Sequence, residues 1–135
     1  MIAPKNFIII LIATISVSIV IILNPISDTD FSNFTFDAVY LKDSNSVSIT
    51  FSDTNTKSSF AVLEILGMEN TFHEEFEIYD SKFTKLIPLD KIPKYGWKTI
   101  PVTLEITYDE SVVYMKTEIH DEDQISPIVI FGKSD

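Results

Sequence analysis

The sequence predicts a mainly β protein, with an N-terminal transmembrane helix followed by one antiparallel β-sandwich domain. Three observations lead to this prediction. Residues 7–23 (FIIILIATISVSIVIIL) contain no charged residue, glycine or proline. The rest of the chain alternates apolar and polar residues over short segments, as half-buried strands do. Turn residues separate these segments at intervals of about 8–12 residues, which is typical of sandwiches and small barrels.

The apolar run Phe7–Leu23 is long enough for a membrane-spanning helix, since about 17–25 residues cross the hydrocarbon core. In lipid a helix satisfies its backbone internally, so the many β-branched residues do not oppose it. A cleaved secretory signal is the alternative. Such signals have an apolar region of only about 7–15 residues and a small-x-small cleavage site. Pro25-Ile26-Ser27 matches that site poorly, and we therefore expect a retained signal anchor.

The charges on either side of the run predict its orientation. Lys5 and the amino terminus precede it, whereas Asp28 and Asp30 follow it. The positive-inside rule then makes residues 1–6 a cytoplasmic stub of a single-pass cell-membrane protein. Residues 24–30 form a short linker, and residues 31–135 form the extracytoplasmic domain. Seven extended residues reach at most about 25 Å, so we expect the domain to work close to the bilayer.

Composition limits the partners of this domain. All ten basic residues are lysines, and nine of them follow the apolar run together with all twenty acidic residues, a net charge of −11. Nucleic-acid phosphates repel such a surface, and no arginine is present to read bases, so we expect no nucleic-acid binding. The chain has no cysteine. Core packing alone must therefore hold a domain of about 105 residues, which is large enough for it.

Alternation is clearest in Ser46–Ser52 and in Pro101–Thr107, where Val102, Leu104 and Ile106 are expected to face the core. Six further segments are candidate strands: Phe34–Leu41, Phe60–Leu66, Thr71–Tyr79, Phe83–Leu89, Val112–Ile119 and Ser126–Phe131. Seven or eight such strands favour an immunoglobulin-like sandwich or a similar small Greek-key fold. The Cys…Trp…Cys mark of true immunoglobulin domains is absent, so this assignment is an analogy of fold.

Candidate metal ligands are few. His73 and His120 are the only histidines, and the alternation in Thr71–Tyr79 and Val112–Ile119 places both opposite the apolar residues, so we expect solvent-exposed side chains. Together with Met68 they could bind a metal ion, and soft ligands favour copper. The alternative is two solvated histidines that bind nothing. The sequence H-E-E that starts at His73 does not match the zinc-protease motif H-E-x-x-H.

Signs of catalysis are also absent from the sequence. It has no G-x-S-x-G, P-loop or dinucleotide-binding motif, and two exposed histidines make a Ser-His-Asp triad hard to build. The acidic loops Asp109-Glu110 and Asp121-Glu122-Asp123 flank one expected strand, which holds them more than about 20 Å apart. Neither loop matches a calcium-loop motif. We therefore expect a non-enzymatic protein without a cofactor.

Two further features suggest surface contacts. Tyr95-Gly96-Trp97 contains the only tryptophan. Such aromatic residues often anchor interfaces, although a core position where a loop enters a strand is the more common role for a residue like Trp97. Asn33-Phe34-Thr35 is the only N-x-[ST] sequon, so Asn33 is a candidate glycosylation site, although such triplets also arise by chance.

Two functions remain compatible with the sequence. The first is a membrane-anchored, extracytoplasmic interaction module, an accessory subunit that docks on a membrane complex or envelope protein. The short linker and the lack of catalytic motifs favour it. The alternative is an extracytoplasmic domain that binds copper or a small ligand. Both place residues 7–23 in the bilayer.

Overall fold

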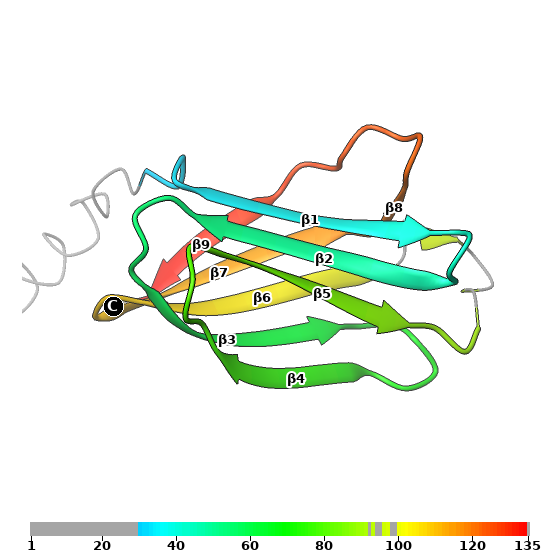
Figure 1. Ribbon diagram of the computed structural model, residues 1–135, viewed down its shortest axis with the longest axis horizontal. Helices are drawn as coiled ribbons and strands as arrows, with labels where there is room; N and C mark the ends of the chain where they lie inside the picture. Colours follow the sequence, from blue (N-terminus) through cyan, green and yellow to red (C-terminus); the bar gives the residue numbers. More distant parts are fainter. Residues whose placement is uncertain (1–29, 92, 94–95, 98–99, 135) are drawn as a thin grey trace, which may run out of the picture. The chain divides into compact units, whose positions relative to one another are not determined.

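The computed structural model describes residues 30–91, 93, 96–97 and 100–134, which form two β-sheets packed on a common core (Figure 1). The chain divides into two units between Asp30 and Phe31. The expected stub 1–6, the expected transmembrane segment 7–23 and linker residues 24–29 lie outside the described residues. In the part of the chain that is described, no helix is long and apolar enough to cross a membrane.

One sheet has four strands in the order β5-β2-β1-β8, and the other has five in the order β4-β3-β6-β7-β9. The first comprises β1 (Phe34–Leu41), β2 (Ser46–Asp53), β5 (Lys82–Pro88) and β8 (His120–Asp121). The second comprises β3 (Ser58–Ile65), β4 (Phe72–Glu77), β6 (Pro101–Tyr108), β7 (Ser111–Glu118) and β9 (Ile130–Ser134). Every pairing is antiparallel except that of β1 with β8. The mainly β, sandwich-like prediction is confirmed.

Alternate residues of the central strands form the core, as the period of two requires. On β6, Val102, Leu104 and Ile106 are each at most 1% exposed. On β2, Val47, Ile49 and Phe51 face them from the other sheet and are equally buried. The expected register of both strands is therefore confirmed. A one-residue shift would have turned all of these side chains to solvent.

The C-terminal part differs from the prediction. Instead of one strand over Ser126–Phe131, the chain leaves the five-stranded sheet after Glu118 and forms the short β8 beside β1. It then returns through a loop to form β9 beside β7, beginning only at Ile130. Pro127 lies in this loop and has no N–H to donate to a ladder, which is one physical reason why the strand starts later.

Side chains bridge the two sheets where their edge strands β4 and β5 meet. The rings of Phe76 and Phe83 pack edge to face with centroids 4.9 Å apart. The Lys85 ammonium lies 2.9 Å from a Glu74 carboxylate oxygen and 4.2 Å from the centroid of the Phe76 ring. This side of the domain is therefore closed by aromatic, ionic and cation–π contacts.

Candidate functional site

The outer face of the five-stranded sheet is defined by its register. Residues that are partners on adjacent strands direct their side chains to the same face. One row across this face consists of Glu75 on β4, Val62 on β3, Glu105 on β6, Tyr114 on β7 and Gly132 on β9. The row therefore changes from acidic at β4 to apolar at β7 and β9.

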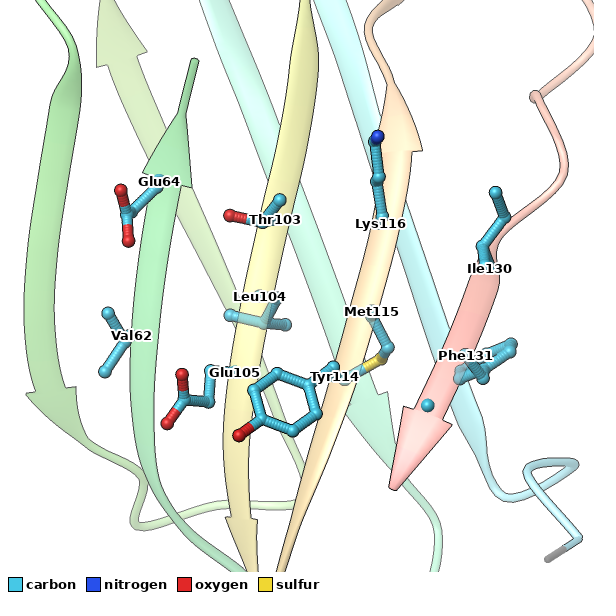
Figure 2. Close-up of a pocket in the computed structure, with 11 residues that line it drawn as sticks. Val62, Glu64, Thr103, Leu104, Glu105, Tyr114, Met115, Lys116, Ile130 and Phe131 are labelled. Carbon is cyan, nitrogen blue, oxygen red and sulfur yellow. The ribbon is translucent and has the colours of Figure 1, made fainter. Parts of the chain in front are cut away.

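The row towards the other end of the strands is mostly polar and becomes apolar only at β9. It consists of His73, Glu64, Thr103, Lys116 and Ile130, in the same strand order. A shallow hollow of about 310 Å³ lies between these two rows. Figure 2 shows Glu64, Glu105, Tyr114 and Ile130 around it, with the tyrosine ring extending towards Glu105. The hollow combines apolar surface with the carboxylates of Glu64 and Glu105.

Exposed apolar side chains recur on β7, on β9 and on the loop that leads into β9. Among the described residues, six large hydrophobic side chains are exposed, and four of these lie on β7, on the loop before β9 or on β9. They are Tyr114, Ile125, Ile128 and Ile130, with Ile125 and Ile128 at 95% and 88% exposure. Single exposed apolar residues are ordinary, and only a contiguous patch of them indicates a contact surface.

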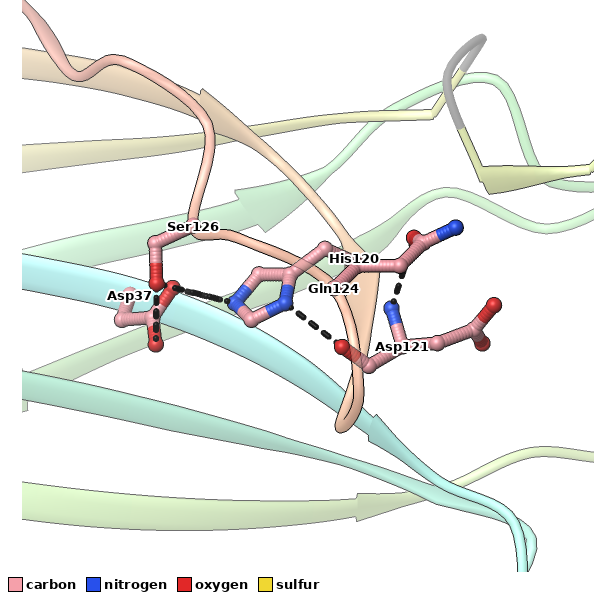
Figure 3. A network of polar contacts seen from close by, with 5 residues as sticks. All are labelled: Asp37, His120, Asp121, Gln124 and Ser126. Atoms are coloured by element: carbon pink, nitrogen blue, oxygen red, sulfur yellow. Dashed lines mark hydrogen bonds and ion pairs between the residues drawn. The ribbon is translucent and has the colours of Figure 1, made fainter.

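A buried histidine holds the loop that carries two of these isoleucines (Figure 3). His120 Nε2 lies 2.8 Å from Oδ1 of Asp37 on β1, and His120 Nδ1 lies 2.7 Å from the carbonyl oxygen of Asp121. Ser126 Oγ lies 3.3 Å from Nε2 and 3.4 Å from Asp37 Oδ2. Each ring nitrogen of His120 thus faces an oxygen atom within hydrogen-bond distance. The network therefore attaches the loop to the four-stranded sheet.

The expectation that His120 is solvent-exposed is wrong, because the residue is only 6% exposed. Its direction relative to the core was anticipated correctly, since it pairs with Val39 on the outer side of β1. The loop after Asp121, through Ser126, covers that side. Alternation along a strand predicts the direction of a side chain. It does not predict whether a distant segment of the chain covers that side chain.

The same geometry bears on serine-hydrolase chemistry. The sequence predicts no Ser-His-Asp triad because it predicts two exposed histidines. His120 is buried, so exposure does not exclude a triad at this residue. A triad needs the carboxylate on one ring nitrogen and the serine on the other. Here Asp37 and Ser126 both contact Nε2, while Nδ1 faces a backbone carbonyl. The arrangement therefore does not have the geometry of a Ser-His-Asp triad, and it links β8 and the following loop to β1.

The structure does not bring the candidate metal ligands together. His73 is exposed on β4, as expected, beside Glu64 and Glu75 at 3.7 and 3.5 Å. β4 and β8 are at edges of different sheets, so His73 and His120 lie on opposite sides of the domain. Met68 is half-buried and packs against the core. No group of three or more His, Asp or Glu side chains suited to a metal ion occurs among the described residues.

Of the two aromatic candidates, the structure describes Trp97 but not Tyr95. Trp97 is 9% exposed, and its ring packs at 4.8 Å, centroid to centroid, on that of Tyr40. This is the core position that the sequence offered as the alternative to an interface anchor. Tyr95 lies outside the described residues, and its expected interface role remains a prediction.

Asn33 and Asp53 form a second polar network that the sequence did not indicate. The Asp53 carboxylate is 1% exposed and accepts hydrogen bonds from Asn33 Nδ2, the Asn55 and Lys57 amides, and the Ser58 amide and hydroxyl. Burial acts to raise the pKa of Asp53, but these hydrogen bonds outweigh it and lower the pKa below 3.8. Asp53 thus fixes the crossing from β2 to β3.

This network also concerns the proposed sequon. Nδ2 of Asn33, the atom that a glycan would modify, lies 3.0 Å from Asp53 Oδ1, and the Asn33 carbonyl accepts a hydrogen bond from the Thr54 amide. The half-buried Asn33 therefore has a structural role, whereas its glycosylation remains a prediction. One sequence signal could have identified Asp53, because it continues the inward series of Val47, Ile49 and Phe51.

Comparison with known proteins assigns the chain to no family. No family model matches it, and no curated protein and no solved structure is significantly similar to it.

Proposed function

We propose that the chain is a non-enzymatic, single-pass membrane protein whose domain outside the cell membrane acts as an interaction module. In this proposal residues 7–23 anchor the chain in the bilayer, residues 24–30 are the tether, and residues 31–135 contact a membrane complex or envelope protein as an accessory subunit. The acidic composition of the domain and the short tether support this assignment.

The observation that carries the proposal is the set of exposed apolar side chains on β7, on β9 and on the loop that joins β8 to β9. Tyr114, Ile125, Ile128 and Ile130 are all at least 44% exposed, and Ser126, next to Ile125 in the loop, contacts both Asp37 and His120. A fixed apolar surface rimmed by carboxylates suits a protein partner with apolar and basic side chains.

We assign the domain to the immunoglobulin-like group of sandwiches on its strand order. The series β5-β2-β1 and β4-β3-β6-β7 corresponds to the order E-B-A and C′-C-F-G of that fold. Immunoglobulin-like domains host many unrelated functions, so this order supports the fold and leaves the function to the surface.

Purification of the tagged full-length chain from membranes in mild detergent tests the proposal. We expect a partner to co-purify with the wild-type chain and to be lost, at least about ten-fold, from the double variant Ile125→Ser/Ile128→Ser. Leu86→Ser is the matched control, because Leu86 is a 59% exposed aliphatic residue at the opposite sheet edge. Equal losses in both variants would contradict the assigned surface.

The tether provides an independent test. Insertion of about twenty Gly/Ser residues between Asp30 and Phe31 should weaken association, because effective concentration falls roughly as the −3/2 power of linker length. A partner bound equally well by the extended chain would contradict the role of the short tether. Stoichiometric copper or zinc on the purified chain would instead favour the metal-binding alternative.

A further inference from the structure

The edge strands of the two sheets are not equally protected against pairing with another strand. Natural sheets protect their edges with charged residues, proline or very short strands. β4 carries three glutamates in six residues, β5 carries two lysines and ends at Pro88, and β8 has only two residues. β4 and β5 also close against each other through the Phe76–Phe83 contact.

β9 differs from these three strands. It is the edge strand beyond β7, and its five residues, Ile130–Ser134, include one charged residue and no proline. Residues 124–134 contain no acidic residue, although the domain as a whole is strongly acidic. The exposed Ile128 and Ile130 lie directly before and within the strand. Its edge is therefore the most favourable for the addition of another strand.

Gly132 at the centre of β9 has no explanation within one copy of the domain. Glycine weakens a strand, and in strand interiors it often marks a close approach of another backbone. Gly132 has no positive φ that would require glycine. A Cβ atom placed on it would meet only the Cβ of Tyr114, at an ordinary 3.9 Å. Neither backbone conformation nor intrachain packing therefore excludes a larger residue at this position.

We propose that β9 pairs antiparallel with β9 of a second copy of this chain, with Gly132 of each copy directly opposite the other. This inference rests on the proposed function. It identifies a second copy of the chain as the partner of the β9 edge. In a two-fold arrangement Ile130 lies opposite Ser134 of the second copy, and each Ile130 flanks the glycine pair diagonally, about 7–8 Å away. The two isoleucine side chains can then cover the open strip above the glycines.

Charge favours a second copy at this edge. Pairing of β9 with itself brings no two acidic residues together, and it places Lys133 opposite Phe131 of the other copy. Pairing of β4 with itself would oppose glutamates, and pairing of β5 with itself would oppose lysines. A two-fold contact uses the same surface on both copies and closes after two, as most homodimers do.

Cysteine cross-linking tests the proposal in the full-length chain in membranes, because the natural chain has no cysteine. Directly opposed residues of antiparallel strands have Cβ atoms about 4.5–5.5 Å apart, which a disulfide can bridge after a small shift. Gly132→Cys should cross-link to a dimer on mild oxidation about ten-fold faster than Leu86→Cys on β5. The 3.9 Å spacing to Tyr114 leaves room for the new side chain.

The register supplies a second, more specific readout. Ile130→Cys and Ser134→Cys, produced with different tags in the same cells, should cross-link to each other and only weakly to themselves. In the Gly132→Cys background, Ile130→Glu should abolish the fast cross-link, whereas Leu86→Glu should leave it unchanged. Both glutamates replace exposed residues, so both variants should keep the wild-type melting temperature.

The outcomes separate this inference from the proposed function. Cross-linking of Gly132→Cys that is no faster than that of Leu86→Cys overturns the self-pairing, as does equal cross-linking at all positions. If the Ile125/Ile128-dependent partner still co-purifies in that case, the proposed function stands without the dimer. If Gly132→Cys cross-links fast and with the expected register but that partner does not co-purify, the dimer is supported and the membrane-complex role is contradicted.

Discussion

The imidazole Nε2 of His120 lies 2.8 Å from the carboxylate of Asp37, although the two residues are 83 positions apart in the sequence. The contact joins the short β8 to β1 and, through Ser126, attaches the loop that continues to Ile125 and Ile128. The position of the loop around Ser126 therefore depends on a buried polar contact.

Replacement of His120 should destabilise the domain. His120→Ala removes the partner of both Asp37 and the Asp121 carbonyl, which should lower the free energy of unfolding by about 2–4 kcal/mol. His73→Ala, at an exposed site on β4, should change it by no more than about 0.5 kcal/mol. Urea denaturation of the two variants measures both values. Equal effects would contradict the role of His120 in linking β8 to β1.

Asp53 should govern part of the acid sensitivity. Its pKa is lowered in the folded state, so the unfolded chain binds the proton more tightly. The stabilisation is fully present above about pH 4 and is lost as the pH falls through the folded-state pKa, below 3.8. Asp53→Asn should lower the free energy of unfolding by about 2–4 kcal/mol at pH 7. As the pH then falls towards 2–3, the variant should lose less further stability than the wild-type domain.

Denaturant titrations at pH 7 and near pH 3 compare Asp53→Asn with wild type and with Asp43→Asn, a change at an exposed position on the β1–β2 turn. We expect Asp43→Asn to follow the wild-type curve at both pH values. An Asp53→Asn variant as stable as wild type at pH 7 would show that the buried carboxylate does not organise the β2–β3 crossing.

The register of β6 predicts which substitutions the domain tolerates. Leu104→Ala should lower the free energy of unfolding by about 2–5 kcal/mol, because Leu104 is 1% exposed in the core. Thr103→Ala and Glu105→Ala, on the outer face, should stay within about 0.5–1 kcal/mol. Thermal melts that ranked the three variants in the opposite order would place the wrong face of β6 in the core.

Thr117 offers a stabilising substitution. Its hydroxyl is buried and has no hydrogen-bond partner among the described residues. Thr117→Val replaces the hydroxyl by a methyl group of similar shape, so stability should be unchanged or should rise by up to about 1 kcal/mol. Thr117→Ser keeps the hydroxyl and removes the methyl group, so it should lower the free energy of unfolding by about 1 kcal/mol. A destabilised valine variant would indicate an unseen partner for the hydroxyl.

Protease added to intact cells tests the expected topology. The domain from Phe31 onwards should be digested, whereas the stub of residues 1–6 should be protected on the cytoplasmic side. Because Phe7–Leu23 is long for a cleaved signal, the mature chain should retain residues 7–23. A mature amino terminus near Asp28 would contradict the retained anchor while preserving the location outside the membrane.

Local pattern determined much of the sheet structure. The bounds predicted for Phe34–Leu41 are those of β1, and the inward series on β2 and β6 were assigned correctly. These features follow from the period of two in a strand and from the turn residues between strands, both of which are local properties of the sequence.

Tertiary structure alone decided the features that define the candidate site. His120 is buried because a loop crosses the outer side of β1, and Asp53, which alternation already directs inward, receives its hydrogen bonds from Asn33 and from the start of β3. The partners of these groups lie up to 83 residues away. Alternation gives the direction of a side chain, whereas burial and pairing depend on which distant segments pack against it.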